Sequence, residues 1–219
     1  FAADEERAAY EDALCAQVEA EGAALLKNDN AALPLASGAK VSLFGHGSVD
    51  LMYGGTGSGS VDTSKAPNLK QALEAQGITI NQTLWDLYSS DSMMSKYSRM
   101  TPASISDTLE ANTQYAVNEA PWSKLSGAES SFAEYGDAAI VVLSRSGGEG
   151  ADLPSGENGT NDSWVSGQEG DGNYLALSAE EKELLANLKT LKDNGTFKNI
   201  VVLINYSNAI ELDFLNPEL

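Results

Sequence analysis

The sequence contains very few of the residues on which most catalytic and metal sites depend. Cys15 is the only cysteine and His46 the only histidine among 219 residues. Disulfide frameworks and Cys/His zinc sites are therefore excluded by counting. Cys15 lies in a helical stretch and is expected to be a small core residue. Chemistry in this chain must rest on carboxylates, hydroxyls, amides or a single histidine.

Positive charge and long apolar runs are also scarce. Only 13 Lys and Arg accompany 32 Asp and Glu, giving a formal net charge of −19. A surface of this sign repels nucleic acid and anionic membranes, which excludes a nucleic-acid role. No run approaches the roughly 18 apolar residues that span a bilayer, and the N-terminus has no signal-peptide pattern. These features predict a soluble chain without membrane contact, and both a cytoplasmic and a secreted location remain open.

The residues that are present follow the pattern of an α/β domain. Four short runs are expected to form strands: 40–45, 78–80, 137–144 and 199–205. The last two are continuous apolar runs, which are typical of strands buried in a parallel sheet. Helices are expected at residues 4–27, from Pro67 to Gly77 and from Ser178 to Asn194, with helices joined by loops over 82–135. Ser178 and Glu181 have the spacing of a capping box at the start of the last of these helices. Strands that alternate with helices predict an open α/β sheet.

Two glycine-rich loops, 45–60 and 145–173, each follow one of these strands. In open α/β sheets, the loops at the carboxyl ends of the strands form the ligand crevice. Both loops are therefore expected to meet at one edge of the sheet. His46 is a candidate ligand contact because it directly follows the strand at 40–45.

The first loop contains the segment YGGTGSGS at 53–60. Glycines permit close approach of the backbone to a ligand. A phosphate-binding P-loop would need a lysine that is absent here, and a dinucleotide fingerprint fails because Asp50 replaces its third glycine. From the residues alone, an ordinary surface loop is the favoured interpretation.

The second loop begins with RSGGEGADLP at 145–154. A carboxylate between glycines at the end of a strand, such as Glu149, can reach a ligand without obstruction. The further acidic residues of the loop suggest calcium, but EF-hand spacing is absent. An acidic, solvated surface loop explains the same residues equally well.

Taken together and in order, these segments resemble the α/β domain of family 3 glycoside hydrolases. The segments are GAALLKN and LPL (22–35), KVSLFG with GGTGSGSV (40–61), IVVLSRSGGEGADLP (140–154), YLALSAEEKELLANL (174–188) and NIVVLINYSNAIEL (199–212). The resemblance extends from about residue 19 to 215 and is weakest over 81–135. GGTGSG and GGEGADLP are most similar to the subgroup in which this domain precedes the barrel.

The resemblance implies a three-layer α/β/α sandwich, flavodoxin-like, with a mostly parallel sheet. An N-terminal helix and connector at 1–36 would precede the sandwich at 37–219, which would lack its last elements. Family members hydrolyse terminal β-linked glycosides, commonly β-glucosides, with retention of configuration. The family's nucleophile is an aspartate on a (β/α)₈ barrel of the same protein, so the isolated chain is expected to be inactive.

The resemblance also assigns roles to individual residues. Glu149 matches the family's general acid/base. The glycine loop would line the sugar site with backbone amides, at Gly54, Gly55, Thr56, Gly57 and Ser58. His46, Arg145 and Asp152 would be secondary sugar contacts, although Leu153 stands where the family often has arginine, and Ser146 would be structural. No cofactor or metal is implied.

Two other function classes remain. A carbohydrate-binding module could keep the fold and the sugar contacts without the chemistry. A flavodoxin-like nucleotide or receiver domain would share the topology, but the missing P-loop lysine and the poor dinucleotide fingerprint argue against it.

Overall fold

The computed structural model describes residues 3–54, 57–59, 62–99, 115–147, 165–166 and 174–215. The chain divides into two compact units, Phe1–Pro34 and Leu35–Leu219. The boundary between them lies two residues before the one expected from the sequence, between residues 36 and 37. The first unit consists mainly of helix α1, Asp4–Gly22, with three acidic residues in its first turn that favour the positive end of the helix dipole. The helix ends at Gly22, five residues before the expected residue 27.

No residue of α1 is buried, and Cys15 is exposed, so the prediction that it is a core residue was wrong. The physical reason is the lack of a packing partner within the first unit. Among the described residues of that unit, the only other regular element is the short 3₁₀ turn Asp29–Ala31, which is itself exposed.

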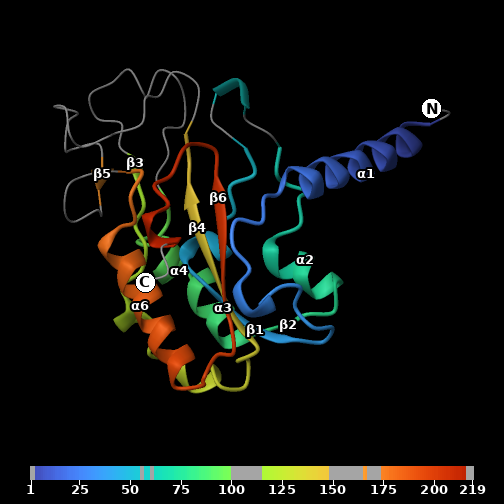
Figure 1. The fold of residues 1–219 in the computed structure, drawn as a ribbon. Helices are drawn as coiled ribbons and strands as arrows, with labels where there is room; N and C mark the ends of the chain where they lie inside the picture. Colours follow the sequence, from blue (N-terminus) through green and yellow to red (C-terminus); the bar gives the residue numbers. More distant parts are fainter. Residues whose placement is uncertain are drawn as a thin grey trace. The chain divides into compact units, whose positions relative to one another are not determined.

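The second unit is built on a four-stranded sheet (Figure 1). Its strands are β1 (Lys40–Phe44), β2 (Thr79–Ile80), β4 (Ala138–Arg145) and β6 (Ile200–Tyr206). The order is β2-β1-β4-β6, and each neighbouring pair is parallel. This confirms the predicted α/β class and parallel sheet.

The central position of β4 explains its sequence. All eight of its residues are buried, because β1 and β6 pair with its two edges and other elements cover both faces. A strand covered on both faces needs a continuous apolar run rather than an alternating one. Residues 138–143 supply that run, and Ser144 and Arg145 end it with polar groups.

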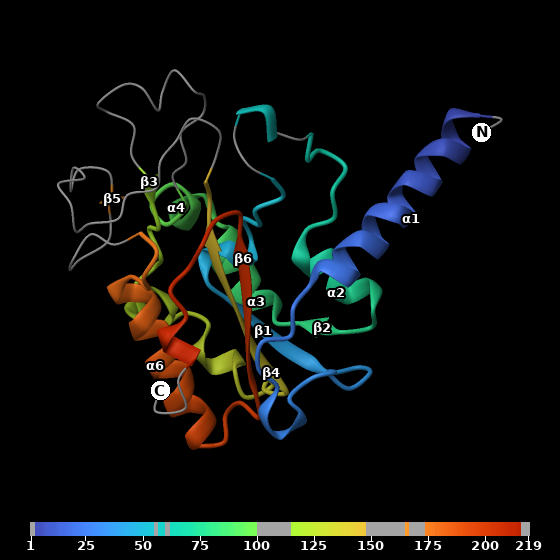
Figure 2. The same ribbon diagram turned by 45° about the horizontal axis from the view of Figure 1, so that its top comes forward.

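Helices lie on both sides of the sheet. Figures 1 and 2 show α3 (Gln82–Ser89), α4 (Asp91–Met94) and α6 (Ala179–Asp193) on one side, and α2 (Leu69–Ala75) on the other. The first three pack on one hydrophobic core that includes strand residues and a group of stacked and edge-on aromatic rings: Phe44, Trp122, Phe132 and Phe197. This is the predicted three-layer arrangement.

Local signals place the helix ends that frame the site. Helix α6 begins after Ser178, whose hydroxyl accepts a hydrogen bond from the Glu181 N–H while the Glu181 carboxylate accepts one from the Ser178 N–H. This is the capping box expected from the sequence. Helix α2 begins at Leu69 instead of Pro67, because Asn68 is its N-cap. The Asn68 side chain accepts a hydrogen bond from the Gln71 N–H, and the Gln71 side chain accepts one from the Asn68 N–H.

The remaining described elements are short. They are the 3₁₀ turns His46–Ser48, Gly57–Gly59, Trp122–Leu125, Glu129–Ser131 and Asp213–Leu215, and the strands β3 (Tyr115–Ala116) and β5 (Val165–Ser166), which pair in parallel. Within the described part of the chain, no helix is long and apolar enough to cross a membrane.

Candidate functional site

The two glycine-rich loops start beside each other. β1 ends at Phe44 and β4 ends at Arg145, and the two strands are parallel neighbours with Phe44 in register with Val141. The carboxyl ends of parallel strands lie at the same edge of a sheet. The described starts of both loops, 45–54 and 146–147, therefore leave this edge together, as the sequence predicted.

Glycine is required where the chain leaves β1. Gly45 has φ +83°, and a Cβ built on it would lie 2.7 Å from the backbone oxygen of Val142. A Cβ on Gly47 would lie 2.9 Å from the same oxygen. The Gly45-His46-Gly47 segment therefore turns tightly against β4, which explains both glycines without a nucleotide.

This turn buries His46, whose relative exposure is 1%. Its backbone N–H donates to Glu119 Oε2 at 2.9 Å, and its Nε2 atom lies 3.9 Å from the same oxygen. His46 was expected to contact the substrate, but in the described structure protein atoms surround it. It instead joins the start of the first loop to Glu119 through its backbone N–H.

Burial controls the charge of both members of this contact. Loss of solvation, together with the positive charges of Arg99 and Arg145, lowers the pKa of His46 to about 3. Burial raises the pKa of Glu119 to about 8, although hydrogen bonds from the N–H groups of His46 and Ala120 oppose the change. At neutral pH His46 is uncharged and Glu119 is mostly protonated, so their contact is not an ion pair.

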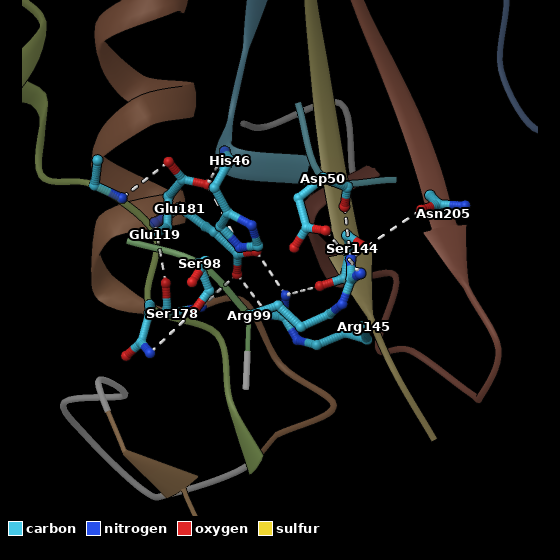
Figure 3. A network of polar contacts seen from close by, with 12 residues as sticks. His46, Asp50, Ser98, Arg99, Glu119, Ser144, Arg145, Ser178, Glu181 and Asn205 are labelled. Atoms are coloured by element: carbon cyan, nitrogen blue, oxygen red, sulfur yellow. Dashed lines mark hydrogen bonds and ion pairs between the residues drawn. The ribbon is translucent and has the colours of Figure 1, made fainter. Parts of the chain in front are cut away.

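Arg99 joins the first loop to the end of β4 (Figure 3). Its Nη1 atom donates to the backbone oxygen of Asp50 at 2.7 Å and to Ser144 Oγ at 2.8 Å. Its Nη2 atom donates to Asp50 Oδ1 at 3.2 Å. Burial raises the pKa of Asp50, and the charge of Arg99 opposes that change. The segment that leads into the glycines is thereby attached to the neighbouring strand.

Arg145, the last residue of β4, is completely buried and uses all five of its N–H donors within the chain. Nη1 and Nη2 donate to the two oxygens of Glu181 at 2.7 and 2.6 Å. The other three donors reach the backbone oxygens of Ser144, Tyr174 and Ala176, each at 3.1 Å. Burial opposes the charge, but Glu181 outweighs it and raises the pKa of Arg145 above its ordinary value.

These contacts close the base of the second loop. Arg145 stands at the start of the loop, whereas Tyr174 and Ala176 follow it, and one guanidinium binds both ends. The Tyr174 hydroxyl also accepts a hydrogen bond from the Ser146 N–H and donates one to the Ser146 carbonyl. Arg145 was expected to contact sugar, but no donor is left for a sugar hydroxyl, so its role is to hold the loop. Ser146 was expected to be structural, and its buried backbone contacts agree with that.

The other predicted site residues belong to the two loops themselves. Gly54 and Ser58 are exposed, and Gly57 begins a 3₁₀ turn. Four others lie outside the described residues: Gly55, Thr56, Glu149 and Asp152. Within the described residues, no group of three or more His, Cys, Asp or Glu side chains could hold a metal ion.

Sequence reasoning did not find Arg99, Glu119 or the second role of Glu181. Arg99 and Glu119 lie in the region 82–135, where no motif marks them, and they reach the site only through the fold. Glu181 was identified as half of a capping box, and that spacing contains no signal for its contact with Arg145.

Comparison with known proteins agrees with the order of the motifs. The model of the glycosyl hydrolase family 3 C-terminal domain matches residues 23–219. Beta-glucosidase A of Butyrivibrio fibrisolvens is 29% identical over 211 residues, which cover 90% of this chain and 21% of that protein. This chain therefore spans about a fifth of that relative's length.

Solved structures give the same result for the fold. A beta-glucosidase from Paenibacillus barengoltzii is 25% identical with a TM-score of 0.60, covering 88% of this chain and 18% of that one. Beta-glucosidase 3B from Thermotoga neapolitana in complex with glucose is 23% identical with a TM-score of 0.65, covering 95% of this chain and 25% of that one. Since the family model covers nearly the whole chain, this chain belongs to the glycosyl hydrolase family 3 C-terminal domain family.

Proposed function

We propose that this chain is the part of a β-glycosidase that supplies the general acid/base and one side of the sugar site. The enzyme would hydrolyse terminal β-linked glycosides, β-glucosides foremost, with retention of configuration. The observation that carries the proposal is the common origin of the two loops at one sheet edge, with the base of the second loop closed by Arg145. The relatives named as beta-glucosidases support it.

Glu149 is the proposed general acid/base. It would protonate the leaving glycosidic oxygen and then remove a proton from the attacking water. Retention requires about 5–5.5 Å between this carboxyl group and the nucleophile. A loop must be held firmly to keep such a distance, and the buried contacts of Arg145 and Tyr174 hold both ends of this one. Asp152 would be a secondary sugar contact from the same loop.

The nucleophile in this proposal is an aspartate on a barrel domain of the same protein. The glycine loop would face the sugar, with backbone amides of Gly54 to Ser58 as donors to its hydroxyl groups. The exposure of Gly54 and Ser58 is compatible with such contacts. Arg145 and His46 would act only through the loops that they support.

The test is turnover of a panel of nitrophenyl β-glycosides by the gene's full-length product, comparing the wild type with Glu149→Gln. We expect Glu149→Gln to lose about 10²–10⁴-fold in kcat, with partial recovery in azide, because general acid–base catalysis contributes about that much. Glu157→Gln, which changes another glutamate of the same loop, is the control and should retain activity.

The outcomes separate the candidate functions. If Glu149→Gln hydrolyses the panel as fast as the wild type, the proton donor lies elsewhere and the assignment is wrong. If the wild type turns over none of the glycosides but binds sugar, the chain belongs to a carbohydrate-binding protein.

A further inference from the structure

The end of β6 contacts the first glycine loop through Asn205. The Asn205 Oδ1 atom accepts a hydrogen bond from the Met52 N–H at 2.6 Å, and its Nδ2 atom donates to the Met52 carbonyl at 2.9 Å. A carboxamide that binds both backbone groups of one residue imitates a neighbouring strand. It therefore fixes the first loop immediately before its glycine segment at 53–60.

Ser207, the residue directly after β6, contacts the second loop. The Ser207 hydroxyl accepts a hydrogen bond from the Gly147 N–H at 2.9 Å and donates one to the Gly147 carbonyl at 3.2 Å. The Ser207 N–H also donates to the Arg145 carbonyl at 3.4 Å. Gly147 lies two residues before Glu149 in the sequence, so Ser207 holds the described part of the loop that leads toward Glu149.

The two contacts share one rigid support. Asn205 is in register with Ser144 and Tyr206 with Arg145. The Ser144 hydroxyl donates to Asn205 Oδ1 at 3.2 Å (Figure 3). Tyr206, which separates the two contact residues, places its ring 5.3 Å from the buried Arg145 guanidinium. A movement of this strand end would therefore move both loops.

We propose that Asn205 and Ser207 are positioning residues for the glycoside hydrolysis proposed above, on which this inference rests. Asn205 holds the glycine loop that contacts the sugar, and Ser207 holds the loop that carries the proton donor. The two residues act on different steps, because one loop binds substrate and the other delivers a proton. They should therefore be distinguishable by their dependence on the leaving group.

The physical basis is the demand for a proton at the leaving oxygen. A phenyl glucoside has a poor leaving group and needs the general acid, whereas a 2,4-dinitrophenyl glucoside departs with little protonation. A displaced acid therefore slows the first substrate much more than the second. A displaced sugar-binding loop weakens binding of both to the same extent.

The experiment measures kcat and KM of the full-length protein on these two glucosides. We expect Ser207→Ala to lower kcat/KM by about tenfold or more on the phenyl glucoside and by less than about threefold on the dinitrophenyl glucoside, since small displacements of a catalytic group have large kinetic effects. Ser207→Thr keeps the hydroxyl and should restore most of the loss. Ser207 is exposed, so neither change disturbs the core.

Asn205→Ala should instead raise KM, and the inhibition constant for glucose, by about fivefold with both substrates, because hydrogen bonds of this kind contribute a modest net free energy. Asn205→Asp keeps the acceptor but loses the donor to Met52, and should give a change in the same direction. Asn205→Asp therefore provides a second test of the proposal if Asn205→Ala does not fold.

The matched controls remove the same groups away from the loops. Asn187→Ala deletes an amide that donates to the Glu183 carbonyl on α6, and Ser89→Ala deletes a hydroxyl that donates to the Trp85 carbonyl on α3. Both should leave the kinetics of the two substrates unchanged.

The results also separate this inference from the proposed function. If Glu149→Gln is impaired while Ser207→Ala slows both substrates equally, or Asn205→Ala leaves KM unchanged, the positioning proposal is overturned and the function stands. If Glu149→Gln matches the wild type, or the wild type hydrolyses neither glucoside, the proposed function fails and this inference fails with it.

Discussion

Arg145 and Glu181 form a two-point ion pair in the interior, with N–O distances of 2.7 and 2.6 Å and side-chain exposures of 0% and 1%. The same Glu181 carboxylate accepts the Ser178 N–H at 2.9 Å and so completes the cap of α6. One buried acid therefore joins the end of β4, the start of α6 and both ends of the second loop. The contacts that hold the described ends of the loop together therefore run through this pair.

Removing one partner of this pair should be strongly destabilising. Glu181→Ala leaves the Arg145 guanidinium buried without its counter-charge, at an expected cost of about 3–5 kcal/mol. Arg145→Ala should cost a similar amount, and the double variant less than the sum, because the second change removes an already unpaired charge. Urea unfolding of the 219-residue chain measures all three.

Ser178→Ala provides the control, because it removes the cap and leaves the ion pair. It should cost only about 1 kcal/mol. Equal costs for Ser178→Ala and Glu181→Ala would show that the capping contact, and not the buried charge, dominates.

The buried pair of His46 and Glu119 predicts how stability changes with pH. The pKa of Glu119 is raised from 4.5 to about 8. Its contribution to the free energy of unfolding is therefore complete below pH 4.5 and is lost as the pH rises toward 8. The pKa of His46 is lowered from 6.5 to about 3. Its contribution to the free energy of unfolding is therefore complete above pH 6.5 and is lost as the pH falls toward 3. The two effects oppose each other between pH 4.5 and 6.5.

The effect of Glu119 should therefore be visible alone between pH 6.5 and 8. There the free energy of unfolding should fall by up to about 1.4 kcal/mol per pH unit. Glu119→Gln keeps an acceptor for the His46 N–H but does not titrate, and should abolish this decline. The control is Glu134→Gln, which changes an exposed glutamate paired with Lys40. If the decline persists in Glu119→Gln, another group causes it.

Alanine substitutions at Gly45 and Gly77 would distinguish the cost of a strained backbone from the cost of steric overlap. Both have positive φ, +83° and +78°, but a Cβ on Gly77 meets no atom within 4 Å, whereas one on Gly45 lies 2.7 Å from the Val142 oxygen. Gly77→Ala should cost about 1–2 kcal/mol from its backbone conformation alone. Gly45→Ala should cost clearly more in thermal or urea unfolding. Equal costs would mean that β4 can move away from the added methyl group.

The isolated 219-residue chain should not hydrolyse nitrophenyl β-glucosides. A general acid without a nucleophile loses most of the rate enhancement of a retaining glycosidase. Circular dichroism would first establish that the chain is folded, and turnover would then be compared with that of the full-length protein. Activity in the isolated chain that Glu149→Gln abolishes would show that the chain contains its own nucleophile.

The sequence by itself determined the class of the domain. The apolar runs predicted β1, β4 and β6 to within about one residue, and the capping box marked the start of α6. These features are encoded by neighbouring residues, because hydrophobic periodicity and helix caps act over a few positions. Parallel strands then required that both loops leave one edge of the sheet. The order of the motifs was enough to identify the family.

Only the tertiary structure decided what the polar residues at that edge do. Arg145 and His46 directly follow the predicted strands at 137–144 and 40–45 in the manner of ligand contacts, yet both are buried. Cys15 is exposed although its sequence suggested a core residue. Their surroundings depend on groups far away along the chain. The Arg145–Glu181, His46–Glu119 and Met52–Asn205 contacts span 36, 73 and 153 residues. Such partners are brought together by the packing of the whole sheet, and no local pattern records them.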